Sequence, residues 1–342
     1  MTPHLTITQA GPALSVQDQG RAGFRAQGLT VGGAADRTAL FEGAALLGQS
    51  PTHAAIEMAG SGGSFTSDAD IRIALCGAEM AAKIDGEPLV WGASHLLTAG
   101  ATLTIGGARN GSYGYLHVGG GFATPKVMGA QGSHLAGGIG ALLTTGDTLP
   151  IGPDVAQEVA MTLPKPDRFG GGKIRIVQSM QTATFDAQTI DRFTATKFRR
   201  DARANRMGVR MEHDGAGFAT AAQLSILSEV VVPGDIQIAG DGAPYVLMYE
   251  CQTTGGYPRI GSVLPCDLPR VAQAQTGAFL TFEFVGMDEA VALQARYLAG
   301  LKALASHVTP LVRDPATMRD LLRYQMISGA VSAVANPFEQ ES

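Results

Sequence analysis

Cysteine is scarce in this sequence, and charged residues are few. The three cysteines, Cys76, Cys251 and Cys266, cannot all pair with one another, and none of them lies in a C-x-x-C spacing. A reduced, cytoplasmic protein is therefore the simplest expectation. Asp, Glu, Lys and Arg make up only 16% of the residues, against 45% for the apolar types, and the net charge is −5. This composition predicts a globular fold.

Long apolar runs and extended basic patches are missing as well. No apolar run approaches the length of a membrane span, and residues 1–9 lack the charged and apolar regions of a secretory signal. Basic residues gather only between Lys197 and Arg210, a cluster that suits an anionic ligand or partner but is too isolated for a nucleic-acid surface. We therefore expect no contact with membranes or nucleic acids.

The short motifs of several enzyme classes are also absent. The sequence has no G-x-x-x-x-G-K-[ST] phosphate loop, no G-x-G-x-x-G after a strand and no G-x-S-x-G nucleophile elbow. Its seven histidines are scattered without paired metal spacing, so no metal site is predicted.

Glycine, in contrast, is abundant, with 45 among 342 residues. Because the glycines follow no collagen-like period, they must serve turns, bulges and close backbone approaches. Apolar and polar residues alternate with period two in several segments, among them 71–75, 102–105, 173–176 and 280–284. The pattern predicts a mainly β fold of barrel or sandwich type with a few helices.

The chain divides into two related halves. Residues 20–25 precede a Gly-Gly segment ending at Asp36, and residues 205–210 precede a similar segment ending at Asp241. Asp36 can cap a helix over 37–47, and Asp314-Pro315 can start another in the tail. The Pro- and Gly-rich middle is the best candidate linker. The predicted parts are a β-domain at 1–150, a linker at 151–172, a β-domain at 173–286 and a helical tail at 287–342.

A series of ordered motifs carries a family resemblance across residues 5–286. The motifs include Ser15–Gly23, Gly33–Asp36, Asn205–Arg210, Gly234–Gln237, Asp241–Pro244 and Gln252–Pro258. In these motifs the chain resembles the KipA/PxpC family, also labelled allophanate hydrolase subunit two. It departs from the family pattern at Gly129–Ser133, and at Glu250, where the family usually has aspartate.

The resemblance implies a fold of two cyclophilin-like β-barrels related by pseudo-symmetry. It also implies that the chain is the PxpC-type subunit of a bacterial 5-oxoprolinase, a hydrolase that consumes ATP and water to open 5-oxo-L-proline to L-glutamate. ATP, with Mg²⁺, would act at the level of the complex. The implied partners are a KipI/PxpB-like subunit, similar in fold to this chain, and a LamB/YcsF-like subunit.

Two alternatives within the resemblance stay open. Related domains form half of the carboxyltransferase of a biotin-dependent urea carboxylase, as in urea amidolyase. Because the chain has no Met-Lys-Met biotinylation site, biotin would then be carried by another subunit. The second alternative is a non-catalytic regulatory partner of a KipI-like protein.

Arg21 and Arg206 hold matching places in the two related motifs. Arginine suits bidentate binding, so each could hold a lactam carboxylate, a carboxyphosphate or ATP. The alternative is that each braces a loop carbonyl or an internal aspartate. We take Arg206 as a candidate catalytic residue and Arg21 as a candidate substrate-binding residue.

Three further candidates for substrate binding are Asp18, Gln237 and Asp241. Asp18 could equally be a loop residue, and Asp241 lies in a Gly-Asp-Gly turn signal. Gln237 alternates with Ile236 and Ile238, so it points away from their apolar face, toward a barrel mouth or solvent.

The segment Gln252–Pro258 has the densest group of hydrogen-bond donors beside glycines. It follows an apolar run at 245–249 that predicts a buried strand. Its hydroxyls can bind a small ligand, and its glycine N–H groups could stabilise the charge that develops when a lactam opens. A tight β-bulge with the tyrosine packed on the barrel is the alternative. The candidates are Thr254 and Tyr257 as catalytic residues, and Thr253, Gly255 and Gly256 as substrate-binding residues.

Overall fold

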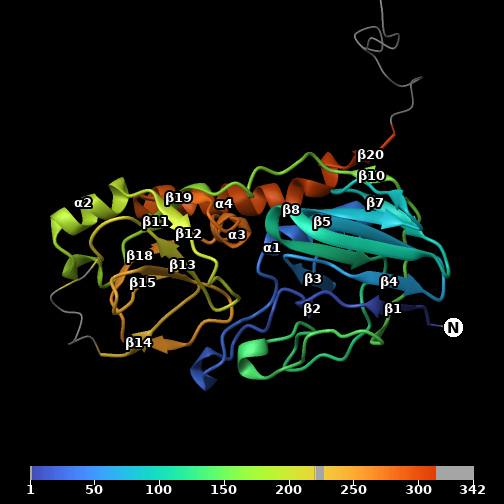
Figure 1. The fold of residues 1–342 in the computed structure, drawn as a ribbon, viewed down its shortest axis with the longest axis horizontal. Coiled ribbons are helices and arrows are strands. Elements are labelled where there is room, and N and C mark those ends of the chain that lie inside the picture. The colour runs from blue at the N-terminus through green and yellow to red at the C-terminus, as the bar shows by residue number, and fades with distance from the viewer. Residues whose placement is uncertain (1, 219, 221–226, 313–342) are drawn as a thin grey trace, which may run out of the picture.

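The computed structural model describes residues 2–218, 220 and 227–312 of the chain. These residues form two β-domains side by side, and a long helix lies along one side of both (Figure 1). The mainly β fold predicted from the alternating segments is confirmed.

The first domain is a nine-stranded sheet curled into a half-barrel. Its two longest strands, β5 and β8, pair antiparallel, and the register shifts at three places between Gly77 and Ala82, which bends the sheet. Strand β8 also pairs with β3 and β4, so that the sheet order is β2-β3-β8-β4-β1-β9. The strands are β1 (His4–Gln9), β2 (Leu14–Gln17), β3 (Ala55–Ala59), β4 (Ser64–Ser67), β5 (Ile71–Ile84), β6 (Glu87–Pro88), β7 (Ser94–Leu97), β8 (Thr102–Val118) and β9 (Thr148–Pro150).

The second domain is a closed barrel with the strand order β11-β18-β15-β16-β13-β12-β19. Four buried phenylalanines, Phe193, Phe198, Phe218 and Phe282, fill one end with ring centroids 5.1–5.7 Å apart. Outside the barrel, β14 (Glu229–Val230) pairs with β17 (Thr254–Gly255). The barrel strands are β11 (Gly172–Val177), β12 (Phe198–Arg200), β13 (Gly208–Glu212), β15 (Asp235–Ile238), β16 (Pro244–Leu247), β18 (Arg259–Val263) and β19 (Phe279–Phe284).

Helices lie around and between the domains. In the first domain, α1 (Arg37–Leu47) begins at Asp36, whose side chain accepts a hydrogen bond from the Thr38 N–H, and ends at Gly48 in the left-handed conformation, as the sequence predicted. Helix α4 crosses from the second domain to the first, where β20 pairs with β10. The remaining elements are α2 (Ala187–Ala195), α3 (Leu268–Gln273), α4 (Met287–Ala303), β10 (Met161–Thr162), β20 (Thr309–Pro310) and the short 3-10 helices Arg25–Gln27, Leu135–Gly137, Thr182–Thr184 and Leu304–His307.

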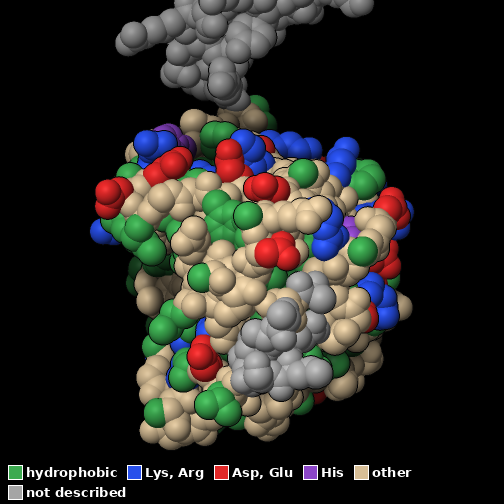
Figure 2. Space-filling view, turned by 90° about the vertical axis from the view of Figure 1, so that its left-hand side faces the viewer, with side chains coloured by type: hydrophobic (Ala, Val, Ile, Leu, Met, Phe, Trp, Pro, Cys, Tyr) green, Lys and Arg blue, Asp and Glu red, His purple; other side chains and the backbone are tan. Residues whose placement is uncertain are grey.

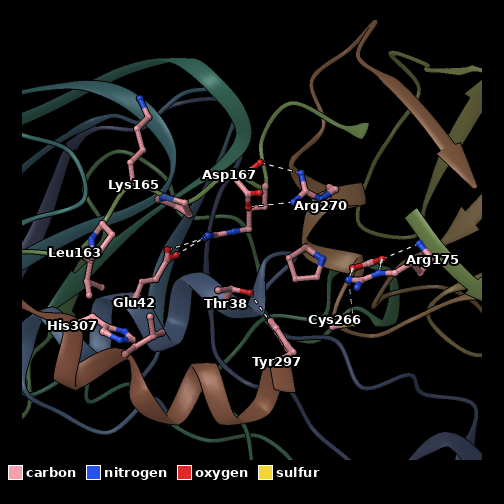
Figure 3. A pocket seen from close by; sticks show the side chains of 16 residues that line it. Thr38, Glu42, Leu163, Lys165, Asp167, Arg175, Cys266, Arg270, Tyr297 and His307 are labelled. Atoms are coloured by element: carbon pink, nitrogen blue, oxygen red, sulfur yellow. Dashed lines mark hydrogen bonds and ion pairs between the residues drawn. The ribbon is translucent and has the colours of Figure 1, made fainter. Parts of the chain in front are cut away.

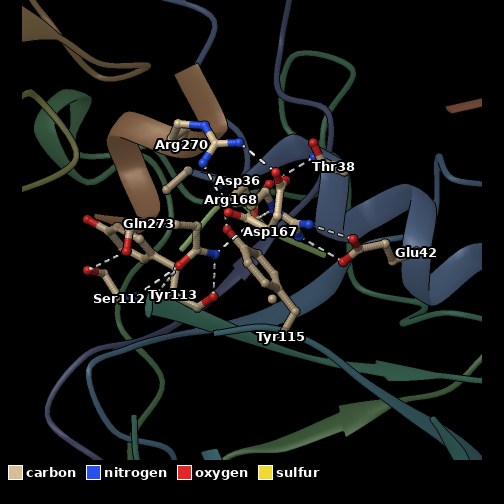
Figure 4. A network of polar contacts seen from close by, with 12 residues as sticks. Asp36, Thr38, Glu42, Ser112, Tyr113, Tyr115, Asp167, Arg168, Arg270 and Gln273 are labelled. Carbon is tan, nitrogen blue, oxygen red and sulfur yellow. Dashed lines mark hydrogen bonds and ion pairs between the residues drawn. The ribbon is translucent and has the colours of Figure 1, made fainter. Parts of the chain in front are cut away.

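The two domains are joined by a buried polar contact as well as by apolar packing (Figure 4). The carboxamide of Gln273, on α3, is fully buried. Its Nε2 donates to Asp36 and to the Tyr113 carbonyl, each at 2.8 Å, while its Oε1 accepts from the N–H groups of Ser112 and Tyr113. All four hydrogen-bonding positions of the amide are therefore used, which fixes α3 against β8 and α1.

Several sequence predictions concern parts of the chain outside these domains. The predicted linker at 151–172 contains β10, and its last residue begins β11. The helix predicted from Asp314 lies outside the described residues. Within those residues, no helix is long and apolar enough to cross a membrane. On the outer face of the second domain (Figure 2), basic and acidic side chains of the described residues are interspersed.

Candidate functional site

A cavity of about 350 Å³ opens on the closed barrel of the second domain. Its walls come from β13, β15 and β16, from the turn before β13 and from the segment that follows β16. This barrel cavity is lined by Arg203, Asn205, Met207, Gly208, Gln237, Ala239, Tyr245, Leu247, Gln252 and Tyr257. The lining residues include one cation, three carboxamides and two phenols, and none of them is acidic.

Two carboxamides form the wall of the barrel cavity nearest to β17. The Nε2 of Gln252 donates to the Oε1 of Gln237 over 3.0 Å. The Nε2 of Gln237 is buried and has no hydrogen-bond partner among the described residues. A Cβ at Gly255 would lie 2.5 Å from this nitrogen, so a larger residue at this position would force the Gln237 amide to move. The wall therefore contains a buried N–H donor without a hydrogen-bond acceptor, which is costly unless a ligand or water supplies one.

The predicted residues of the Gln252–Pro258 segment divide into two groups. Tyr257 lines the barrel cavity, and its side chain is 49% exposed. Thr254 and Gly255 form β17, which pairs with β14, and the Thr253 carbonyl accepts from the Val231 N–H at 3.0 Å. Thr253, Thr254, Gly255 and Gly256 thus lie beside the cavity rather than in its lining. The short β17–β14 ladder orients the segment that bears Tyr257.

Arg206 lies at the boundary of the two domains rather than in the barrel cavity. Its Nη1 pairs with Glu57 of the first domain, its Nε donates to Glu250 at 2.6 Å, and its Nη2 donates to the Gly33 carbonyl. Burial alone would lower the pKa of Arg206, but the two carboxylates outweigh it and raise the pKa. Each guanidinium nitrogen already has a protein partner. This geometry favours a positioning role, and the predicted catalytic role stays a prediction.

The two carboxylates on Arg206 are themselves held on both sides of the boundary. Glu57 accepts hydrogen bonds from the Tyr115 hydroxyl and the Ala35 N–H, each at 2.7 Å. Glu250 accepts from the Ala136 N–H at 2.9 Å. Because Glu250 stands two residues before Gln252, these contacts anchor the start of the Gln252–Pro258 segment on the first domain. The first domain therefore positions one wall of the barrel cavity.

Arg21 and Asp18 brace the glycine-rich loop of the first domain. The Nη2 of Arg21 donates to the Gly132 carbonyl, and Asp18 accepts from the N–H groups of Gly20 and Gln131 at 2.8 and 2.7 Å. Burial lowers the pKa of Arg21, against the opposing charges of Asp18 and Glu250. Both side chains have the loop-bracing contacts that the sequence left as an alternative, and the structure does not bring them into the barrel cavity.

A chain of ion pairs runs along the outside of the barrel cavity. Asp241 accepts from Arg210 at 2.9 Å and from the Ala243 N–H at 3.0 Å, as expected of a turn residue. Arg210 also donates to Asp201 at 2.8 Å, and Asp201 binds Arg203. The hydrogen bonds from Arg203 are the main reason that the pKa of Asp201 lies far below its usual value, with burial opposing them. This series of ion pairs ends at Arg203, in the lining of the barrel cavity.

Sequence reasoning missed three of the polar residues of the barrel cavity. Arg203 was part of the basic cluster between Lys197 and Arg210, which indicated an anionic ligand but not which arginine would meet it. Asn205 and Gln252 belong to motifs that carried the family resemblance. The signal was present in all three, and the missing information was which side chains the barrel brings together.

A second, larger cavity of about 480 Å³ lies between the domains (Figure 3). This inter-domain cavity is lined by Thr38, Glu42, residues 163–168, Arg175, Cys266, Asp267, Pro269, Arg270, Tyr297, Leu304 and His307. Its arginines are paired: Arg168 with Asp36 and Glu42, Arg175 with Asp267, and Arg270 with Asp167. The Tyr297 and Thr38 hydroxyls hydrogen-bond at 2.7 Å.

Residues 27–284 match the family model of the carboxyltransferase domain, subdomain A and B. The chain belongs to this family. The chain is 33% identical to the C subunit of the 5-oxoprolinase of Escherichia coli, and the alignment covers 84% of this chain and 93% of the relative. This match confirms the family resemblance seen in the ordered motifs.

Solved structures agree with the observed fold. The crystal structure of TTHA0988 has a TM-score of 0.75 and 27% identity, and the alignment covers 82% of this chain but 56% of that one. The Kluyveromyces lactis urea amidolyase has a TM-score of 0.78 at 20% identity, covering 92% of this chain and 21% of the other. The carboxyltransferase-domain fold thus recurs within longer chains.

Proposed function

We propose that this chain is the PxpC-type subunit of a 5-oxoprolinase, which opens 5-oxo-L-proline to L-glutamate with the consumption of ATP and water. The observation that carries the proposal is the match to the E. coli 5-oxoprolinase subunit, which extends over most of both chains. The barrel cavity supports it, because one arginine, three carboxamides and no acid suit a small amide that bears a carboxylate.

The barrel cavity can bind and orient such a lactam. The unpaired Nε2 of Gln237 and the hydroxyl of Tyr257 are donors available to a ring carbonyl, and donors aimed at that oxygen stabilise the charge it gains on attack. The apolar surfaces of Met207 and Leu247 face the same space and can contact the ring methylenes. These residues would hold the substrate, while partner subunits supply the remaining groups.

ATP and Mg²⁺ fit the complex better than they fit this chain alone. The barrel cavity has one cationic side chain, whereas a triphosphate with its metal calls for several charged contacts. Among the described residues there is no group of three His, Cys, Asp or Glu side chains that could hold a metal ion. We therefore assign nucleotide binding to the complex and derive no step on this chain through it.

The mouth of the barrel cavity is suited to a partner. Met207 and Tyr257, which line it, are 44% and 49% exposed, and Val230, on the strand paired with β17, is 57% exposed. Exposed apolar side chains around a polar site are typical of a surface covered by another protein. We assign this role to a KipI/PxpB-like subunit, with a LamB/YcsF-like subunit completing a cytoplasmic enzyme.

Reconstitution tests the proposed function. The purified chain alone should be inactive, whereas the chain with its two cognate partner subunits should release L-glutamate from 5-oxo-L-proline only when ATP is present. Glutamate release is measured by a coupled dehydrogenase assay. The absence of release with all three subunits and ATP would contradict the proposal.

A second candidate function is supported by the family match itself. The family model is that of a carboxyltransferase domain, and the urea amidolyase of K. lactis shares the fold. As a carboxyltransferase half, the chain would need a carboxybiotin carrier and the KipI/PxpB-like partner to carboxylate urea or a similar amide. Transfer of labelled carboxylate to urea in that mixture, without glutamate release from 5-oxo-L-proline, would favour this function over the first.

A further inference from the structure

Arg203 is the one charged residue in the lining of the barrel cavity, and its guanidinium is held from one side only. Its Nε and Nη2 donate to Asp201 Oδ2 over 3.0 and 2.6 Å, and its backbone N–H donates to Oδ1 of the same carboxylate. Its Nη1 has no hydrogen bond with any residue that the structure describes. The Nε–Nη2 edge of Arg203 is therefore held by Asp201, whereas its Nη1 is available to a ligand.

Asp201 holds Arg203 in place. Its side chain is only 4% exposed, and it is bound by Arg210 as well as by Arg203. Arg210 is also paired with Asp241 and lies 3.9 Å from Glu212, so the two aspartates already balance Arg203 and Arg210 in number. What favours an anion at Arg203 is therefore geometry, because its Nη1 has no hydrogen bond with a described residue and none of the residues that line the barrel cavity is acidic.

Two neighbouring side chains, Asn205 and Gln237, add hydrogen-bond donors. Asn205 uses its Oδ1 to accept from the N–H groups of Met207 and Gly208, at 2.8 and 3.2 Å. Its Nδ2 remains a donor in the cavity lining. With the unpaired Nε2 of Gln237, the cavity presents a fixed cation and two amide donors to one small space.

We propose that Arg203 is the residue by which the barrel cavity selects ligands with a carboxylate, and that Asp201 positions it. The carboxylate would pair with the Nη1 edge of Arg203, and the amide portion of the ligand would lie toward Gln237. The choice of 5-oxo-L-proline as the ligand rests on the proposed function, whereas the selection of a small carboxylate rests on the cavity alone.

Kinetics of the reconstituted three-subunit complex test the proposal. The substrates are 5-oxo-L-proline and 5-oxo-L-prolinamide, in which a neutral amide replaces the carboxylate. Arg203→Met should raise KM for the acid by up to about fivefold, the loss expected for an ion pair made by a side chain that is 67% exposed, and leave KM for the amide unchanged. Asp201→Asn should raise the same KM to a smaller extent, and kcat should change little in either variant.

Arg199→Met is the matched control, because Arg199 is half exposed, pairs with Glu212 at 3.4 Å and lies outside the cavity lining. A KM for the acid that rises no more in Arg203→Met than in Arg199→Met would overturn the assignment. An equal rise for acid and amide would also overturn it, because the effect would then not depend on the carboxylate.

A binding experiment separates this inference from the proposed function. If the complex does not turn over 5-oxo-L-proline, the full chain is titrated by NMR with acetate, with 5-oxo-L-proline and with inorganic phosphate. Carboxylate binding that Arg203→Met removes would support the inference even though the proposed reaction had failed. Carboxylate binding that survives the substitution, a preference for phosphate, or no binding of any of the three would overturn it.

Discussion

The two cavities of the molecule differ in how their charges are paired. The inter-domain cavity is larger, at about 480 against 350 Å³, and it has several charged residues in its lining. Each of its arginines nevertheless meets a carboxylate of the protein. The barrel cavity has a single charged residue in its lining, Arg203. The difference lies in where the acids are: Glu42, Asp167 and Asp267 line the inter-domain cavity itself, whereas no acid lines the barrel cavity.

Arg168 illustrates what charge does in the inter-domain region. It donates to Asp36 at 2.7 Å and to both oxygens of Glu42, at 2.6 and 2.8 Å, and all three side chains are nearly inaccessible (Figure 4). Burial acts to lower the pKa of Arg168, but the two carboxylates more than reverse this and raise it. Because Arg168 comes from the connecting segment and both carboxylates from the first domain, this contact fixes the connection between the domains.

Removal of the Arg168 charge should have the largest effect on stability. Arg168→Met leaves Asp36 and Glu42 buried without their common partner, which should cost about 3–5 kcal/mol of unfolding free energy. The measurement is urea denaturation followed by far-UV circular dichroism. Lys165→Met is the control: its side chain is 72% exposed and pairs with Glu79, so its loss should cost less than about 1 kcal/mol. Equal losses in the two variants would contradict the structural role of Arg168.

Acid should have the next largest effect on stability, through a buried histidine of the first domain. His117 is buried beneath α1, the helix that carries Glu42, and burial lowers its pKa to about 4. Since the unfolded chain keeps the ordinary pKa of about 6.5, it takes up the proton first as the pH falls. The unfolding free energy should therefore decrease by roughly 3 kcal/mol between pH 7 and pH 4. His134, whose pKa burial also lowers, acts in the same direction.

Comparison with His117→Asn assigns this pH dependence. Asparagine does not titrate, so the variant should lose less stability over the same pH interval, whatever its stability at pH 7. Denaturation midpoints at several pH values measure the slope. An unchanged slope in the variant would show that other groups cause the acid effect.

The parts of this structure that could be predicted from sequence depend on neighbouring residues. The helix at 37–47 follows from Asp36 and Gly48, both of which act on backbone groups within a turn of their own position. The strands follow from period-two alternation. That Gln237 points away from the apolar face of Ile236 and Ile238, toward a barrel mouth or solvent, was likewise a local inference.

The role of Arg206 could not be predicted in the same way, because its partners are distant. Arg206 binds Glu57, 149 residues away, and Glu250, 44 residues away. In sequence, Arg199, Arg203 and Arg206 look alike within one basic cluster. In the fold, one pairs on the surface, one lines the cavity and one is buried between domains. Arg206 is decided by the packing of the two domains, whereas Arg203, whose partner Asp201 is two residues away, is decided by which side chains the barrel brings together around the cavity.

Substitution of Gly255 tests the barrel cavity, and of the changes considered it should have the smallest effect on stability. Gly255→Ala places a Cβ 2.5 Å from the Gln237 Nε2 and 3.3 Å from Val231, so the unpaired amide must move. Because this amide is the end of a flexible side chain, moving it should cost little stability, at the low end of the roughly 1–3 kcal/mol typical of overpacking. We expect this cost to fall mainly on ligand binding, because β17 is a short ladder outside the closed barrel.

The measurement for Gly255→Ala is KM for 5-oxo-L-proline in the reconstituted complex, together with the urea denaturation midpoint of the chain. Gly240→Ala is the matched control, since Gly240 lies in the turn between β15 and β16 and a Cβ there meets nothing within 4 Å. KM should rise in the first variant and not in the second, while both keep similar midpoints. If Gly255→Ala lowers the midpoint as strongly as Arg168→Met and leaves KM unchanged, Gln237 belongs with the structural contacts, and the contrast between the two cavities fails.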